Sequence, residues 1–196
     1  SGASKKPLIF RRDTASRVAL RLTMRRIAAT LAVVGVLLFG AGSAWADFDD
    51  GVAALKRGDY ATALQEFRLL AEQGHAGAQN DLGVMFGNGL GVSQDHTEAA
   101  KWYRKAAEQG DAVAQNNVGI VYSTGLGVSQ DHAEAAKWYR KAAEQGHVEA
   151  QKNLGGMYSN GLGVSKNEAE ATKWFRKAAE QGLANAQKNL GFMYFS

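Results

Sequence analysis

The side chains that could carry out chemistry in this chain are few and far apart. Four histidines, His75, His96, His132 and His147, are the natural candidates for metal ligands or general bases. Cysteine is absent, which excludes disulfides, a thiol nucleophile and cysteine-rich zinc sites. Neither a G-x-S-x-G elbow nor a phosphate-binding G-x-x-x-x-G-K-[ST] loop is present. The sequence therefore predicts no catalytic residues, no metal and no cofactor, and the histidines are interpreted as solvated residues near helix ends.

The net charge of +4 divides unevenly along the 196 residues. Residues 1–46 carry eight Lys or Arg against Asp13 alone, whereas residues 47–196 carry 15 basic and 18 acidic side chains. Nucleic-acid binding needs clustered Lys and Arg to displace counterions from phosphates. An acidic body lacks that pattern, so no nucleic-acid partner is expected.

Residues 27–46 contain no charged side chain. Met24 and two arginines precede this apolar run, and Ala44-Trp45-Ala46 ends it with small residues at A-x-A spacing. This order is typical of a secretory signal peptide over 24–46, preceded by an upstream segment 1–23. The alternative is an uncleaved membrane anchor, since about 20 apolar residues can span a bilayer. Either reading exports the rest of the chain, which we expect to be periplasmic or secreted, or anchored to the inner membrane if the leader is retained.

Three short motifs recur at intervals of 36 residues. Glu-Gln-Gly occupies 72–74, 108–110, 144–146 and 180–182, and Gly-Leu-Gly-Val occupies 89–92, 125–128 and 161–164. A tryptophan followed by an aromatic residue stands at 102–103, 138–139 and 174–175. Such self-similarity at a fixed period predicts a repeat architecture.

Each unit is expected to form two helices. The first covers 76–87 in the first unit, where Ala78, Leu82 and Phe86 form an apolar stripe. Gly83 recurs at positions 119, 155 and 191. Glycine inside a helix costs about 1 kcal/mol relative to alanine, so its repetition suggests close approach of a neighbouring helix.

A glycine-rich loop and a second helix complete the unit. Leu90 and Val92 in the loop are expected to fill the seam between units. The second helix starts with a capping box, Asp95 with Glu98, and ends before Gly110, where a left-handed residue is favoured. The tryptophan and tyrosine that follow the box are predicted to be buried.

The pattern A-x-A-Q-x-x-L-G-x-M-Y…G-x-G-V…A-x-K-W-Y-R-K-A-A-E-Q-G resembles the Sel-one-like repeat, a branch of the tetratricopeptide superfamily. The resemblance implies an all-α, right-handed solenoid of stacked antiparallel helix pairs. It divides the chain into a tetratricopeptide-like hairpin at 47–74, repeats at 75–110, 111–146 and 147–182, and the first helix of an incomplete repeat at 183–196.

The resemblance also implies a function, that of a non-catalytic adaptor that binds a protein or peptide, often in the bacterial cell envelope. One alternative is a cell-wall or β-lactam hydrolase or penicillin-binding protein, but that cysteine-rich branch has a disulfide pair that this chain lacks. The other is a structural module that self-associates through the edge at 183–196. The chain would contact a membrane only through an uncleaved leader.

A helical wheel at 100° per residue places a second set of positions opposite Leu82. In the tetratricopeptide architecture that side of the first helix lines the concave groove. The predicted partner-binding residues are Asn80, Val84, Asn116, Ile120, Lys152, Lys188 and Phe192. The neighbouring positions Asp81, Asn117, Asn153 and Asn189 are instead expected to form hydrogen bonds between helices.

Overall fold

The structure, a computed structural model, describes residues 47–195, with side chains up to residue 191. The predicted leader (24–46), the segment before it and the side chain of Phe192 lie outside the described residues. All regular elements in the described range are helices: α2 (Phe48–Lys56), α3 (Tyr60–Glu72), α4 (Ala76–Asn88), α5 (His96–Glu108), α6 (Ala112–Thr124), α7 (His132–Glu144), α8 (Val148–Asn160), α9 (Glu168–Glu180) and α10 (Ala184–Phe195). No helix in this range has the length and apolarity needed to cross a membrane.

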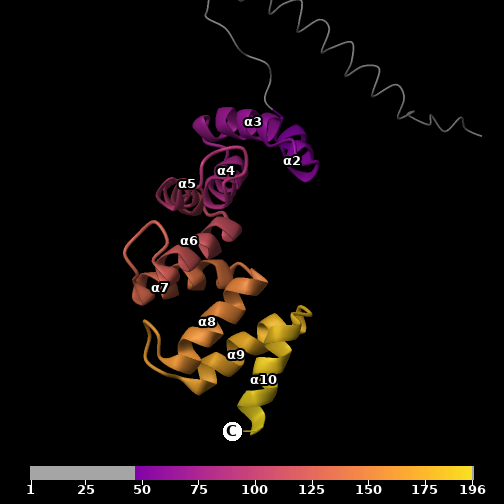
Figure 1. Cartoon of the computed structure of the whole chain (residues 1–196). Helices are drawn as coiled ribbons and strands as arrows, with labels where there is room; N and C mark the ends of the chain where they lie inside the picture. Colours follow the sequence, from indigo (N-terminus) through magenta and orange to yellow (C-terminus); the bar gives the residue numbers. More distant parts are fainter. Residues whose placement is uncertain (1–46, 196) are drawn as a thin grey trace, which may run out of the picture. The chain divides into compact units, whose positions relative to one another are not determined.

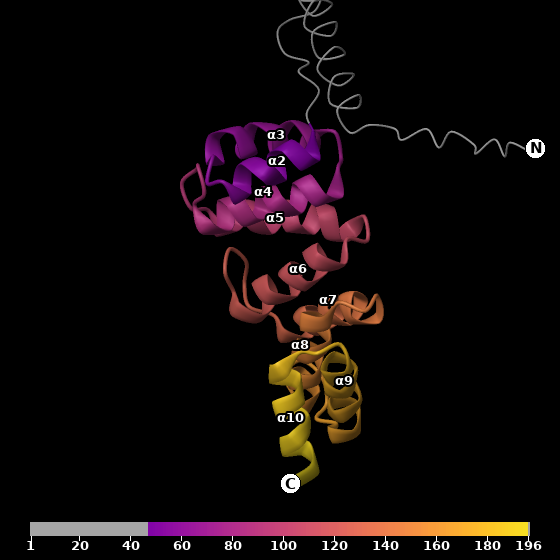
Figure 2. The ribbon, with the colours of Figure 1, turned by 90° about the vertical axis from the view of Figure 1, so that its right-hand side faces the viewer.

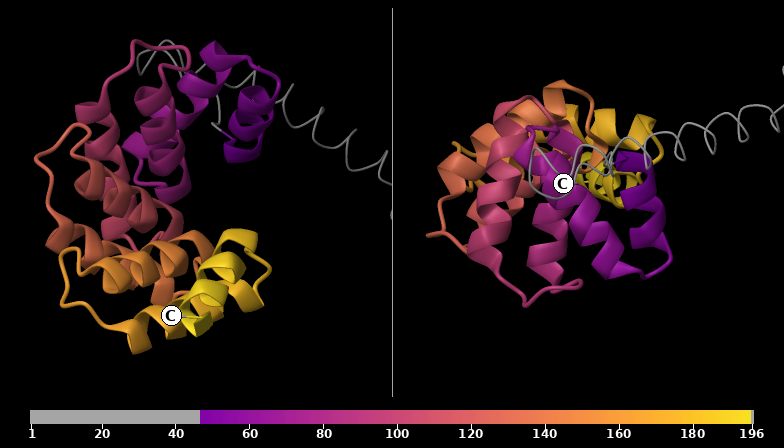
Figure 3. Two further views of the ribbon diagram at one scale, coloured as in Figure 1. Left: turned by 60° about the horizontal axis from the view of Figure 1, so that its bottom comes forward. Right: turned by 90° about the horizontal axis from the view of Figure 1, so that it is seen from above.

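The helices pack in sequence order (Figure 1). The most extensive contacts of each helix are with the helices directly before and after it, and they are greatest within the pairs α4–α5, α6–α7 and α8–α9. Figures 2 and 3 show the same succession from other sides. One such pair cannot cover its own apolar face, so stacking on its neighbours completes each core. The predicted all-α repeat solenoid is confirmed.

The core consists of three successive clusters along the described residues. The first joins α2, α3 and α4 around Phe67 and Leu82. The second joins α5, α6 and α7 around Val118 and Trp138, and the third joins α7, α8 and α9 around Leu154. Small alanines occupy most of the other buried positions, which allows the helices to approach closely.

The repeated glycines of the first helices confirm this close approach in three places. A Cβ added at Gly83 would lie 2.7 Å from the Tyr103 ring, and one at Gly119 would lie 2.5 Å from the Tyr139 ring. Gly155 similarly faces Phe175 at 2.8 Å. At Gly191 an added Cβ would meet nothing within 4 Å among the described side chains.

The second helices start with only half of the predicted capping box. The Asp95 carboxylate accepts a hydrogen bond from the Glu98 backbone N–H at 2.9 Å, as expected for an N-cap. The reciprocal bond does not form, because the Asp95 N–H donates to the Phe86 carbonyl instead. The Glu98 carboxylate pairs with Lys101 at 2.9 Å. Asp131 and Asn167 cap their helices through the same bond to the residue three positions on.

The glycine-rich loops fill the seams as predicted at Leu90 but not at its counterparts in the later repeats. Leu90 is partly buried against the first cluster, but Leu126 and Leu162 are 47% and 43% exposed. In the later loops the backbone itself occupies the seam, since a Cβ on Gly163 would lie 2.1 Å from the His132 carbonyl oxygen. Gly163 also has φ +65°, so both its conformation and its surroundings require glycine.

Candidate functional site

The predicted partner-binding residues lie along the successive first helices α4, α6, α8 and α10. We call the side of these helices that carries them the first-helix face. It is defined by Asn80, Val84, Val113, Asn116, Ile120, Lys152, Gly156 and Lys188. These positions differ in how much of each side chain reaches the surface.

Asn80 and Asn116 are only 7% and 6% exposed, which differs from the solvent-facing position that the helical wheel predicts. The reason is the next repeat. Asn117 Nδ2 donates to Asn80 Oδ1 at 2.9 Å, and Asn153 Nδ2 donates to Asn116 Oδ1 at 3.2 Å. The expected interhelical hydrogen bonds of Asn117 and Asn153 are thereby confirmed, and the two buried asparagines act as their acceptors.

The same face carries exposed apolar side chains. Val113 and Ile120 on α6 are 46% and 39% exposed, and Val84 on α4 is partly exposed. Val113 and Ile120 lie seven residues apart, which places them two turns apart on one side of the helix. Exposed apolar side chains clustered on one face mark interaction surfaces more often than scattered ones do.

Two lysines follow on the later helices. The Lys152 ammonium forms a close ion pair with Glu149, one turn earlier on α8. Lys188 occupies the equivalent position on α10 and is exposed. The face thus changes along the array from asparagine at α4 and α6 to lysine at α8 and α10.

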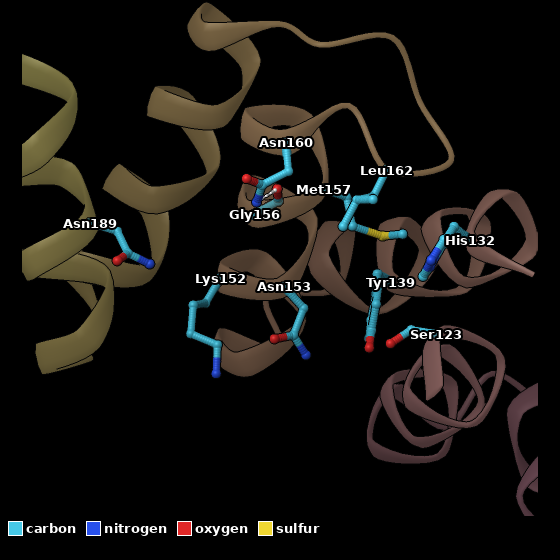
Figure 4. Close-up of a pocket in the computed structure, with 10 residues that line it drawn as sticks. All are labelled: Ser123, His132, Tyr139, Lys152, Asn153, Gly156, Met157, Asn160, Leu162 and Asn189. Atoms are coloured by element: carbon cyan, nitrogen blue, oxygen red, sulfur yellow. Dashed lines mark hydrogen bonds between the residues drawn. The ribbon is translucent and has the colours of Figure 1, made fainter. Parts of the chain in front are cut away.

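A hollow of about 270 Å³ opens over α8 (Figure 4). Its lining comes from α6, α7, α8, α10 and the loop after α8: Ser123, His132, Tyr139, Lys152, Asn153, Gly156, Met157, Asn160, Leu162 and Asn189. The Asn160 amide donates to the Gly156 carbonyl at 2.8 Å. The hollow therefore extends along the first-helix face beside one of its predicted residues, Lys152.

Two tyrosines lie beneath this face in a poorly hydrated environment. Burial raises the pKa of Tyr139, while a hydrogen bond with Ser123 opposes the rise. Burial and the nearby Asp81 carboxylate raise the pKa of Tyr103 to about 12. Burial also raises the pKa of Asp81, although the hydrogen bond from Asn80 acts against it. Both tyrosines are therefore neutral at physiological pH and act as packing groups.

A second set of amides, which the sequence analysis did not identify as functional, bridges the repeats inside the array. Gln115 Nε2 donates to the Ala107 carbonyl at 3.2 Å, and Gln115 Oε1 accepts from Gln145 Nε2 at 2.7 Å. The same pattern occurs at Gln79 and Gln151, and all three glutamines are at most 5% exposed. The signal in the sequence is a glutamine at the same repeat position beside the core alanine.

The histidines mainly serve helix ends. His75 Nδ1 and His147 Nδ1 accept hydrogen bonds from the backbone N–H groups of Ala78 and Ala150, at 3.1 and 3.2 Å. Burial lowers the pKa of His147. His132 differs, since its buried Nδ1 has no partner among the described residues. Within residues 47–195 no three metal-ligating side chains come together.

Comparison with known proteins agrees with this architecture. The Sel1 repeat model matches residues 76–111, 112–147 and 148–183. None of the curated proteins matches the chain. A solved Sel1 repeat protein from Oxalobacter formigenes is 40% identical with a TM-score of 0.72, and the match covers 76% of this chain and 61% of that one.

Two further solved structures are similar. The protective antigen c5321 of uropathogenic Escherichia coli, which displays an SLR fold, is 44% identical with a TM-score of 0.68 over 69% of this chain and 29% of its own. Helicobacter pylori cysteine rich protein B is 26% identical with a TM-score of 0.50, over 77% of this chain and all of its own. This chain spans less than two thirds of the length of the first two proteins.

Proteins with this repeat typically serve as scaffolds for protein–protein interactions and are generally non-enzymatic. The family model covers more than half of the chain, and its three matches coincide with the three helix pairs α4–α5, α6–α7 and α8–α9. The chain belongs to the Sel1 repeat family.

Proposed function

We propose that this protein is a non-catalytic scaffold of the bacterial cell envelope that binds an extended protein segment on the first-helix face. The observation that carries this proposal is the coincidence, on α6 and α8, of exposed apolar side chains with a hollow. Val113 and Ile120 expose apolar surface, and the hollow beside Lys152 and Gly156 continues the same face. A preformed surface of this kind binds without a large ordering cost.

The export of the scaffold rests on the sequence at 24–46, with its apolar run and A-x-A end. Fractionation of bacteria that express the full chain tests this part. We expect the protein in the periplasm or the medium, or at the inner membrane if the leader is retained. Recovery from the cytoplasm alone would refute it.

The binding face is tested by photocrosslinking in the same cells. A photoreactive phenylalanine analogue replaces Ile120 on the first-helix face, and the matched control replaces Lys137, an exposed residue of α7. We expect a crosslinked partner at position 120 and none at position 137. Crosslinks of equal yield at both positions, or at 137 alone, would show that the partner lies elsewhere.

A further inference from the structure

One position on the first-helix face lacks the side chain that its counterparts carry. Gly156 stands on α8 where the two preceding first helices have Val84 and Ile120. A Cβ added to Gly156 would meet nothing within 4 Å among the described side chains, whereas one added to the adjacent Gly155 would lie 2.8 Å from the Phe175 ring. Packing within the array therefore explains Gly155 but does not explain Gly156.

The missing side chain leaves one continuous hollow across α8. Ser123 on α6 and Asn189 on α10 both belong to its lining, and Figure 4 shows them on opposite sides of Gly156. An isoleucine at position 156 would project into the space between them. Because glycine stands there instead, the volume of about 270 Å³ is open to a group from outside the array.

Part of the lining is apolar. Met157 is only 5% exposed, and Leu162 lies in the loop that follows α8. The Leu162 backbone N–H donates to the Met157 carbonyl at 3.0 Å, which ties this loop to the helix. The Tyr139 side chain completes this part of the lining. Thioethers and aromatic rings make favourable contacts with a further aromatic ring.

The polar part of the lining has no uncompensated charge among its acidic, lysine and arginine residues. None of the ten residues is acidic, and the single lysine, Lys152, pairs with Glu149 at the rim. The amide nitrogens of Asn153 and Asn160 already donate within the array, but no described residue donates to their side-chain oxygens. These oxygens can accept a hydrogen bond from a hydroxyl or an N–H group. A charged group would lose its hydration here without gaining a free opposite charge.

We propose that the hollow over α8 is a pocket for one aromatic side chain with a polar tip, a tyrosine or a tryptophan, of the bound segment. The ring occupies the space that valine and isoleucine fill in the preceding repeats and packs against Met157 and Leu162. Its hydroxyl or indole N–H donates to the side-chain oxygen of Asn153 or Asn160. Such side chains are enriched among the residues that dominate binding energies. This inference rests on the proposed function and specifies a side chain that the first-helix face selects.

The test starts from random phage-displayed peptides selected on the full chain. We expect the recovered peptides to share a tyrosine or a tryptophan at one position. Replacing that residue by alanine should weaken binding at least about tenfold in titrations, because the burial of a large side chain is lost. Replacing a tyrosine by phenylalanine should weaken binding by about two- to tenfold, because the donor at the tip is lost.

Variants of the protein locate the pocket. Gly156→Ile fills the hollow with the side chain of the preceding repeat and should weaken the aromatic peptides at least about tenfold. Lys137→Ile is the matched control, because it adds the same side chain on α7, where Lys137 is 65% exposed, and it should leave binding unchanged. A melting temperature of Gly156→Ile at or above that of the wild type shows that this variant is folded. The substitutions in the peptide test the pocket without any change to the protein.

Two further measurements identify the occupant. A benzophenone side chain in place of the aromatic residue of the peptide should crosslink to residues 156–162, mapped by mass spectrometry. The affinity should change by less than about twofold between about 0.1 and 0.5 M salt, because salt screens charges and the side chain in the pocket is neutral.

The outcomes separate the pocket from the scaffold. Peptides that share no aromatic residue, yet are weakened by Ile120→Ser on the first-helix face, would refute the pocket and leave the scaffold function intact. Aromatic peptides that bind Gly156→Ile as tightly as the wild type, or that crosslink outside residues 156–162, would have the same consequence. Failure of the wild-type chain to select any peptide would refute both.

Discussion

Gly119→Ala is the sharpest test of how the helix pairs pack. An added Cβ would lie 2.5 Å from one carbon of the Tyr139 ring and within 3.0 Å of two others, and this ring is only 4% exposed. Overpacking of this kind costs about 1–3 kcal/mol, and the close contact with a fixed ring favours the upper part of that range. The higher helix propensity of alanine offsets about 1 kcal/mol of this destabilisation. The free energy of unfolding should therefore fall by about 1–2 kcal/mol.

The matched control is Gly191→Ala on α10, which stands at the same repeat position. Among the described side chains none lies within 4 Å of its added Cβ, so only the helix propensity acts and stability should rise by up to about 1 kcal/mol. Thermal unfolding of the full chain, followed by far-UV circular dichroism, measures both. For a chain of this size 1 kcal/mol shifts the midpoint by about 2–4 °C, so the two variants should move in opposite directions.

A double-mutant cycle then isolates the cause. Tyr139→Ala removes the ring that Gly119 accommodates, and in that background Gly119→Ala should become stabilising. If Gly119→Ala stabilises the wild-type chain as much as Gly191→Ala does, the close approach of Tyr139 is not the reason for the glycine. A destabilisation that persists without the Tyr139 ring would lead to the same conclusion.

Three further changes test the polar links and the caps. Gln115→Leu should lower the free energy of unfolding by about 1–3 kcal/mol in urea denaturation, because it removes the two hydrogen bonds that the Gln115 side chain makes with Ala107 and Gln145, each worth about 0.5–1.5 kcal/mol. Asn153→Ala should destabilise the chain by about 1 kcal/mol, because the Asn153 side chain donates a hydrogen bond to Asn116 of the preceding repeat. Asn189→Ala should have no such effect, because Lys152 stands where Asn189 would need an acceptor. Equal effects of the two changes would contradict this difference between the repeats. Burial lowers the pKa of His147 in the folded chain, so the folded state binds this proton less readily than the unfolded state. The stability that the neutral His147 provides is complete above about pH 6.5 and is lost as the pH falls through the lowered pKa. His147→Asn keeps a capping side chain without a titrating group, and it should flatten the dependence of the melting temperature on pH between 7 and about 5.

The fold could be predicted because stacking imposes the same demands on every repeat. Phe67 and Leu82 in one cluster and Leu154 in another occupy buried positions that the helical period marks directly. The caps and loops were harder to predict, because their hydrogen bonds and packing involve atoms from other segments of the chain. The reciprocal capping bond is absent because the Phe86 carbonyl already holds the Asp95 N–H, and no local pattern indicates that contact.

The candidate site was only partly predictable for a related reason. A helical wheel describes one helix and not what covers it, so it identified the side of Ile120 correctly but placed Asn80 in solvent. The neighbouring Asn117, which comes 37 residues later, buries that amide and uses its oxygen. The hollow could not be predicted from the wheel either, since it results from a missing side chain at Gly156 together with helices α6, α7 and α10 around it.

Departures from the repeat carry information that the repeat itself does not. Residues that recur in every unit, such as the buried glutamines, are explained by what stacking requires. Lys152 and Gly156 have no such explanation. Glycine at position 156 costs about 1 kcal/mol of helix propensity, although no described side chain comes close enough to require it. Lysine at position 152 lacks the interhelical hydrogen bond, worth about 0.5–1.5 kcal/mol, that Asn80 and Asn116 make. Two destabilising choices at one seam, on the face with the exposed apolar residues, are expected where a partner rather than the array completes the contacts.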